Sequence, residues 1–154
     1  MATIMFFIKA ESEKEARKIL DDMVFIKTHV AKYRIYPVGD KWLGRPEKAD
    51  ENKTFSFAVV WSHSDDKELI EKFAKAQFEQ TVQLWNDGII ENAYFATENA
   101  YENVSTIPGM AYFVNAGNEV TARKILDDMV FIKEGIATYR LFPVGTFWLG
   151  SKDD

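Results

Sequence analysis

The sequence contains no cysteine, and this absence excludes several kinds of chemistry. Without cysteine there are no disulfides and no thiolate nucleophiles, and the composition is typical of a reducing compartment such as the cytoplasm. Histidine is scarce too, with two residues in 154. The sequence has no zinc-ligand spacing, no phosphate-binding glycine loop and no nucleophile-elbow motif. We therefore expect no metal and no cofactor.

Long apolar runs and clustered basic residues are also missing. No run approaches the roughly 20 apolar residues that span a bilayer, so we expect no membrane span. The N-terminal stretch lacks a basic region and a small-residue cleavage site, which predicts no signal peptide. The 19 Lys and Arg are scattered among 24 acidic residues, which predicts no nucleic-acid partner. Apolar residues make up 47% of the chain, enough for a substantial core.

One segment occurs twice. The letters ARKILDDMVFIK at residues 16–27 return unchanged at residues 122–133. Over 16–44 and 122–150, which are 106 positions apart, 21 of 29 residues are identical. We call residues 1–44 the first copy, residues 107–150 the second copy, and the different segment 54–98 the middle unit.

Each copy predicts a strand, a helix and a second strand. Residues 6–8 form a short apolar run typical of a buried strand. Ser12 is a candidate helix N-cap with Glu15 as its capping-box partner, and Asn118 takes the cap position in the second copy. The helix carries an apolar stripe suited to packing on a sheet. Residues 30–36 then alternate as a strand, which the following proline ends.

The middle unit predicts the same order of elements. Residues 54–63 alternate as a strand with Phe55, Phe57, Val59 and Trp61 on one face. A long helix over 65–87 ends at Gly88, and residues 89–97 form the returning strand. The polar segment 45–53 is interpreted as a linker, and 98–109 as a loop.

The fold class follows from these units. The middle unit and the second copy together give βαββαβ, a ferredoxin-like antiparallel sheet over residues 54–150, so the class is α+β. Residues 1–44 are then an additional duplicated βαβ half-domain. We expect them to pair with another chain, either across a two-fold axis or by completing a neighbour's sheet. The alternative is a six-stranded sheet within one chain.

The stretch EARKILDDMVFIKTHVAKYRIYPVG, at residues 15–39, resembles the YCII-related family and is similar to the second half of muconolactone isomerase-like proteins. Both belong to the dimeric α/β-barrel superfamily. The resemblance implies a homodimer or higher homo-oligomer and a cavity that binds small organic molecules. Members of the YCII-related family tend to pair a helix His with the motif Asp. Asp22 and Asp128 are present here, but Gln77 replaces the His and cannot act as a general base.

Three residues are candidates for catalysis. His63 lies on the strand face that carries Trp61, and is either an acid–base group or a partly exposed turn residue. Arg140 lies mid-strand, where it needs a partner such as a substrate carboxylate or a Glu across a dimer interface. Asp128 closes the helix of the second copy, where it either takes part in acid–base work or stabilises the following turn.

Four further residues are candidates for ligand contact. Arg34 is the counterpart of Arg140 in the first copy. Trp61 and Tyr112 are aromatic strand residues. Trp148 follows a strand end, where it covers a pocket or packs in an interface.

Two functions remain open at this stage. One is a non-catalytic domain that binds a small molecule or forms an oligomer through residues 1–44. The alternative is an isomerase or lyase acting on a small aromatic or cyclic carboxylic acid, with Arg140 holding the carboxylate and His63 moving a proton. The enzyme requires these two side chains to converge on one apolar cavity, whereas a cavity filled by Phe and Trp favours assembly.

Overall fold

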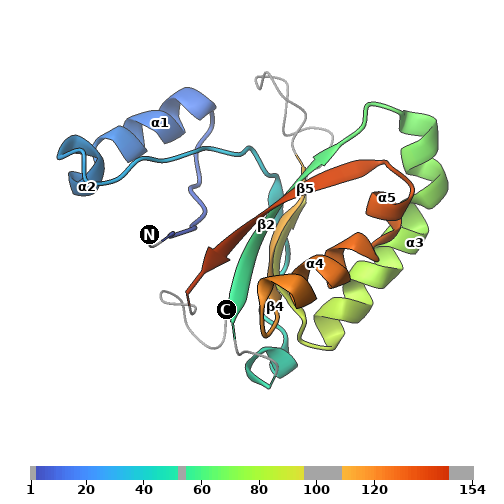
Figure 1. Cartoon of the computed structure of the whole chain (residues 1–154). Coiled ribbons are helices and arrows are strands. Elements are labelled where there is room, and N and C mark those ends of the chain that lie inside the picture. The colour runs from blue at the N-terminus through green and yellow to red at the C-terminus, as the bar shows by residue number, and fades with distance from the viewer. Residues whose placement is uncertain (1–2, 52–54, 96–108, 146–154) are drawn as a thin grey trace.

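A five-stranded antiparallel sheet forms the centre of the molecule (Figure 1). In this computed structural model, residues 3–51, 55–95 and 109–145 are described. The strands lie in the order β1 (Asp40–Leu43), β3 (Ile90–Phe95), β4 (Ala111–Asn115), β2 (Ser56–His63) and β5 (Ala137–Val144). When the edge strand β1 is set aside, the other four strands lie in the order of a βαββαβ ferredoxin-like sheet. The predicted α+β fold class is therefore confirmed.

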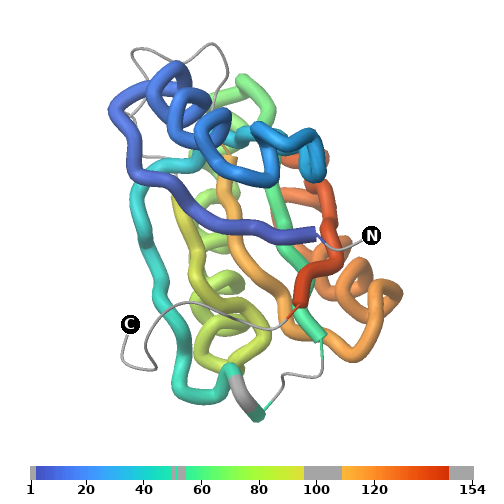
Figure 2. The backbone as a smooth tube through the Cα atoms, turned by 90° about the vertical axis from the view of Figure 1, so that its left-hand side faces the viewer, coloured from blue at the N-terminus to red at the C-terminus, as the bar shows by residue number. Residues whose placement is uncertain are grey.

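The helices lie on both sides of the sheet (Figures 1 and 2). One face is covered by α3 (Lys67–Asn86), α4 (Glu119–Asp127) and α5 (Val130–Lys133). On the opposite side lie α1 (Glu13–Asp21) and α2 (Val24–Lys27), which belong to the first copy. No helix in the described part of the chain combines the length and the hydropathy of a membrane span.

The core lies between the sheet and helices α3 to α5. Strand β2 alternates as predicted, and Phe57, Val59 and Trp61 point into this core. Met129 and Phe131, at the start of α5, pack into the same cluster. The middle unit and the second copy therefore supply the two halves of one core.

Two glutamines of α3 hold the second copy in place. The Gln77 side-chain oxygen accepts a hydrogen bond from the Phe131 N–H at 2.9 Å, and that of Gln80 accepts from the Val130 N–H at 2.8 Å. The Gln80 amide also donates to the Asp128 carbonyl at 3.0 Å. Gln77, which replaces the His expected from the family resemblance, thus satisfies a buried backbone donor.

The predicted helix ends are confirmed. Ser12 and Asn118 each accept a hydrogen bond from the backbone N–H three residues further on. The Glu15 carboxylate accepts from the Glu11 N–H at 2.8 Å, one residue before the Ser12 N–H that a capping box predicts. Gly88 follows α3 with φ at +73°, a left-handed conformation that glycine adopts without strain.

Both strands predicted in the first copy are wrong. Residues 6–8 and 30–36 lie outside the sheet, and the strand of this copy is β1, further along the chain. In the second copy β4 and β5 flank β2 and pair with it on both sides. Among the described residues, no strand lies between the corresponding segments of the first copy. These extended segments therefore have no strand to pair with. The six-stranded alternative is also wrong, because the sheet of the described residues has five strands.

Two other expectations need correction. Strand β5 continues through Pro143, although the proline was expected to end it. It is tolerated because β5 is an edge strand, where a missing N–H removes no ladder bond. Within the predicted linker 45–53, residues Glu47–Asp50 form a 3-10 helix, and Ala49 is buried. A Cβ at Gly88 would overlap the Lys48 carbonyl, so this helix packs closely on the end of α3.

Candidate functional site

The two copies have the same local structure. Helices α1 and α4 are equal in length, and the short helices α2 and α5 follow them at the same spacing. The Tyr33 hydroxyl donates to Asp21 at 2.6 Å, and the Tyr139 hydroxyl donates to Asp127 at 2.8 Å. Because these contacts lie within each copy, the repeated sequence alone accounts for the repeated conformation.

The surroundings of the two copies are very different. The exposed fractions are 0%, 6% and 1% for Met129, Phe131 and Ile136, but 44%, 62% and 73% for their counterparts Met23, Phe25 and Val30. Side chains that build the core in one copy therefore face solvent in the other. We call Ile19, Met23, Val24, Phe25 and Val30 the uncovered face.

The uncovered face also lacks the hydrogen bonds that its counterpart makes. In the second copy, the N–H groups of Val130 and Phe131 are bound by Gln80 and Gln77 of α3. The N–H groups of Val24 and Phe25 have no partner among the described residues. The first copy thus carries a surface shaped for a neighbour, and α3 of its own chain is already occupied.

The extended segments of the first copy cover the second face of the sheet (Figure 2). The Phe7 ring stacks on Tyr94 with 3.7 Å between centroids and meets Phe113 edge-on at 6.2 Å. Tyr36 approaches Phe142 at 6.2 Å. By the family resemblance, a second sheet would meet this face across a dimer. In this chain, residues of the same subunit lie there.

Three of the predicted site residues lie together. Trp61 is 5.9 Å from Tyr112 and 6.1 Å from His63, measured between ring centroids, on the helix-covered face. Burial lowers the pKa of His63 and raises the pKa of Tyr112 well above its usual value. The Trp61 indole acts against this shift of the Tyr112 pKa. By geometry, the Trp61 N–H and the Tyr112 hydroxyl meet no hydrogen-bond partner among the described residues.

Arg140 points away from this cluster. Its neighbours in β5, Tyr139 and Leu141, pack against the core, so the alternation of the strand directs Arg140 to the opposite face of the sheet. There its guanidinium is exposed and donates to the Tyr36 hydroxyl at 3.4 Å. Arg140 and His63 therefore do not converge on one cavity.

The other predicted site residues lie at separate places. Arg34 is exposed in the first copy. Asp128 is the exposed C-cap of α4 and forms an ion pair with Lys133, as Asp22 does with Lys27. Trp148 lies outside the described residues.

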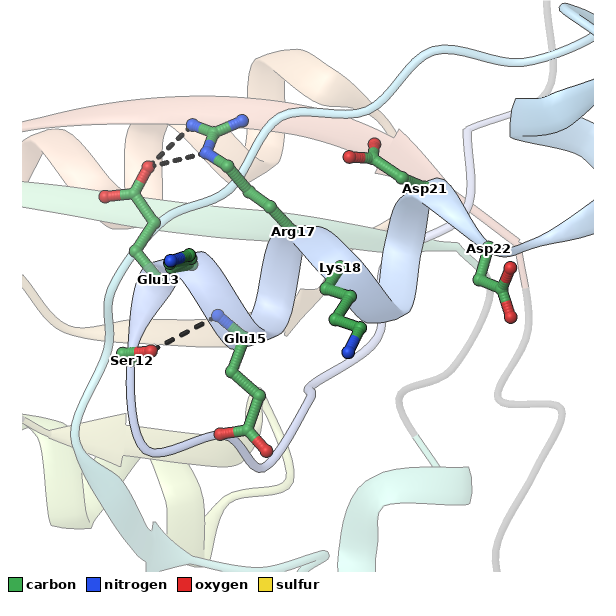
Figure 3. Close-up of a pocket in the computed structure, with 8 residues that line it drawn as sticks. Ser12, Glu13, Glu15, Arg17, Lys18, Asp21 and Asp22 are labelled. Atoms are coloured by element: carbon green, nitrogen blue, oxygen red, sulfur yellow. Dashed lines mark hydrogen bonds and ion pairs between the residues drawn. The ribbon is translucent and has the colours of Figure 1, made fainter.

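A hollow runs along the charged side of α1 (Figure 3). Eight residues line it, and all of them come from this helix and its two ends. The Glu13–Arg17 pair on its rim is held within the helix by a hydrogen bond of 2.8 Å. A hollow with one helix as its only wall cannot enclose a small molecule. Within the described ranges, no three His, Asp or Glu gather to hold a metal ion.

Sequence reasoning missed the glutamines that hold the second copy. Gln77 and Gln80 stand three positions apart on α3, so they share a helix face. The signal available from the sequence was two amide side chains on the apolar stripe of a helix. It does not reveal that their partners are the backbone N–H groups of α5.

Comparisons with known proteins assign no family. No family model and no curated protein matches the chain. A solved structure that resembles it is 5-chloro-2-hydroxyhydroquinone dehydrochlorinase (TftG) from Burkholderia phenoliruptrix AC1100, in complex with 2,5-dihydroxybenzoquinone. The TM-score is 0.45 at 13% identity, over 64% of this chain and 98% of that one. This likeness indicates no activity, and the resemblance to the YCII-related and muconolactone isomerase-like proteins stays a prediction.

Proposed function

We propose that the chain is a non-catalytic, self-associating protein that buries the uncovered face of its first copy against a second copy of the same chain. One observation carries the proposal: identical side chains are buried in the second copy and exposed in the first. Phe131 is 6% exposed, and its counterpart Phe25 is 62% exposed.

Burial of the uncovered face provides a strong driving force for association. Each large apolar side chain contributes about 1.5–3 kcal/mol when it is fully removed from water. Ile19, Met23 and Val24 follow one another along the end of α1 and the start of α2. Phe25 comes next in sequence, and the Val30 N–H donates to the Phe25 carbonyl at 3.0 Å. A contiguous apolar patch of this kind marks an interaction surface more often than scattered exposed residues do.

A second copy of the chain is the partner that fits this face. At a two-fold interface the same surface patch of each chain meets itself, so an unpaired charge near the axis would face a like charge. Arg17 pairs with Glu13, and Lys27 pairs with Asp22, within the first copy itself. These two pairs are therefore neutralised within the chain before association, and neither presents an unpaired charge to the same face of another chain.

The geometry disfavours the isomerase or lyase alternative. That mechanism places an arginine and a histidine at one substrate, whereas Arg140 and His63 lie on opposite faces of the sheet. Around His63 the space is occupied by aromatic rings, with Phe131 at 5.9 Å and Trp61 at 6.1 Å between centroids. Aromatic filling of this kind favours assembly over catalysis.

Sedimentation velocity over a dilution series tests the proposal. The wild-type chain should sediment as a dimer or larger species at micromolar concentration and dissociate on dilution. Phe25→Asp places a charge in the uncovered face and should give a monomer. Val120→Asp is the matched control, because Val120 is 78% exposed on α4 and lies in the other copy. A monomeric wild type at micromolar concentration would remove the proposal.

A further inference from the structure

We infer that the first copies of two chains pair with each other across a two-fold axis, and that the segment before the helix of the first copy, residues 3–9, bars it from the core of a neighbour. This inference rests on the proposed self-association and specifies its geometry. It decides between two-fold pairing and the exchange of copies between chains.

The number of surfaces in each chain argues against exchange. Every chain supplies two copies of the apolar helix face and one middle unit that can cover a copy. A first copy that entered a neighbour's core would displace the second copy there and expose an equal surface. Exchange therefore leaves the uncovered area unchanged, whereas pairing of two first copies buries both.

The segment before the helix makes the two copies unequal. With the same offset of 106, Thr3 is the counterpart of Gly109, and Met5 is the counterpart of Ala111. A Cβ at Gly109 would overlap the carbonyl oxygen of Trp61, a backbone atom that cannot turn aside as the end of a flexible side chain can. Ala111 is 0% exposed, so a methionine in its place would overpack the site.

A third position adds a charge to this mismatch. Asn115 is 3% exposed, accepts a hydrogen bond from the Ser56 hydroxyl at 3.0 Å and donates to the Gly88 carbonyl at 3.2 Å. Its counterpart in the first copy is Lys9. An ammonium group there would be buried away from water, which is strongly unfavourable without a paired anion.

The helix segments provide no such discrimination. Residues 16–27 and 122–133 are identical, so either helix would fit against α3. The segment before the helix, residues 3–9 against 109–115, distinguishes the copies here, and it admits the second copy to the core. The first copy keeps the same apolar helix face and is left to meet its own counterpart.

Cysteine crosslinking tests this geometry in a chain that has no cysteine of its own. Single substitutions Ile19→Cys, Met23→Cys and Val24→Cys should give a disulfide-linked homodimer for at least one position after oxidation. Val120→Cys, on an exposed site of the other copy, should stay monomeric on the same non-reducing gel.

A mixed sample tests exchange. Gln80 contacts the N–H of Val130, so exchange would bring residue 24 of one chain against residue 80 of another. Chains with Val24→Cys are therefore mixed with chains with Gln80→Cys. A disulfide between residues 24 and 80, without homodimers at residues 19, 23 or 24, would overturn the inference.

Two further measurements separate the possible failures. If the reduced variants sediment as monomers, the proposed self-association itself is wrong. If they sediment as dimers but no position of the uncovered face crosslinks to itself, only the two-fold pairing is wrong. The barrier is tested directly by Asn115→Lys, which should lower the melting temperature, whereas Lys9→Asn should leave it unchanged. Equal melting temperatures for both variants would contradict the barrier.

Discussion

Phe25 and Phe131 allow the same substitution to be made twice in one molecule. The two residues occupy equivalent positions in identical segments, and they differ only in what surrounds them. Phe131 packs in the core with Trp61 at 6.5 Å between ring centroids. Truncation to alanine at each position therefore separates the effect of the surroundings from the effect of the local sequence.

The structure sets the expected size of the two effects. Phe131→Ala removes a nearly fully buried ring and leaves a cavity, which costs about 3–5 kcal/mol of the free energy of unfolding. Phe25 is 62% exposed, so its truncation in an isolated chain removes a little over a third of the burial of a core ring. That corresponds to roughly 1 kcal/mol.

Urea unfolding followed by circular dichroism measures both values in a solution dilute enough for the proposed assembly to dissociate. Since a domain of this kind has about 5–15 kcal/mol of stability in total, Phe131→Leu provides a milder variant that stays folded. At higher protein concentration the effect of Phe25→Ala should grow, because association stabilises the folded state by mass action. Equal losses for Phe25→Ala and Phe131→Ala in dilute solution would show that Phe25 is buried within its own chain, contrary to the structure.

Three further predictions concern hydrogen bonds and pH. Gln77→Leu should lower the free energy of unfolding by about 1–3 kcal/mol, because it leaves the buried Phe131 N–H without an acceptor, and chemical unfolding measures this loss. Tyr33→Phe and Tyr139→Phe should each lower the free energy of unfolding by a similar amount, about 0.5–1.5 kcal/mol, because both hydroxyls donate to an aspartate of their own copy. Unequal losses in dilute solution would contradict the shared local structure. Burial lowers the pKa of His63 from its usual value of 6.5, so the unfolded chain takes up the proton first as the pH falls. The contribution of His63 to stability is therefore complete above pH 6.5 and declines below it. The free energy of unfolding, measured between neutral and mildly acidic pH, should show this decline. The decline should be smaller in the His63→Asn variant and unchanged in the His29→Gly variant.

The local elements of the fold could be predicted from the sequence because their causes are local. The caps at Ser12 and Asn118, the glycine after α3 and the alternation of β2 each depend on residues a few positions apart. The strands of the first copy could not be predicted in the same way. A strand needs a neighbour, and the identical pattern forms β5 in one copy and an extended segment outside the sheet in the other.

The candidate site was predicted in part. Trp61, Tyr112 and His63 do lie together, since they share the helix-covered face of neighbouring strands. The enzyme alternative required Arg140 to join His63, but the phase of one strand relative to another depends on the register of the sheet. That register pairs Arg140 with Val60, whose side chain lies on the face away from Trp61. Periodicity within a single strand contains no information about this register.

The non-identical positions of the repeat contain the remaining information. Identity across the helices shows that the chain carries two equivalent apolar faces. The differences Thr3 against Gly109 and Lys9 against Asn115 decide which of them enters the core. They acquire this meaning only when the contacts of Gly109 and Asn115 are known.

Oxidation of two methionines by dilute hydrogen peroxide tests most directly whether association covers the first copy. Met23 and Met129 are equivalent residues with exposed fractions of 44% and 0%, and oxidation of methionine follows exposure. Peptide mass spectrometry should find that Met129 reacts slowly at every protein concentration, whereas Met23 reacts quickly in dilute solution and becomes protected as the concentration rises. A rate for Met23 that is fast and unchanged across the whole concentration range would contradict burial of this face in an assembly.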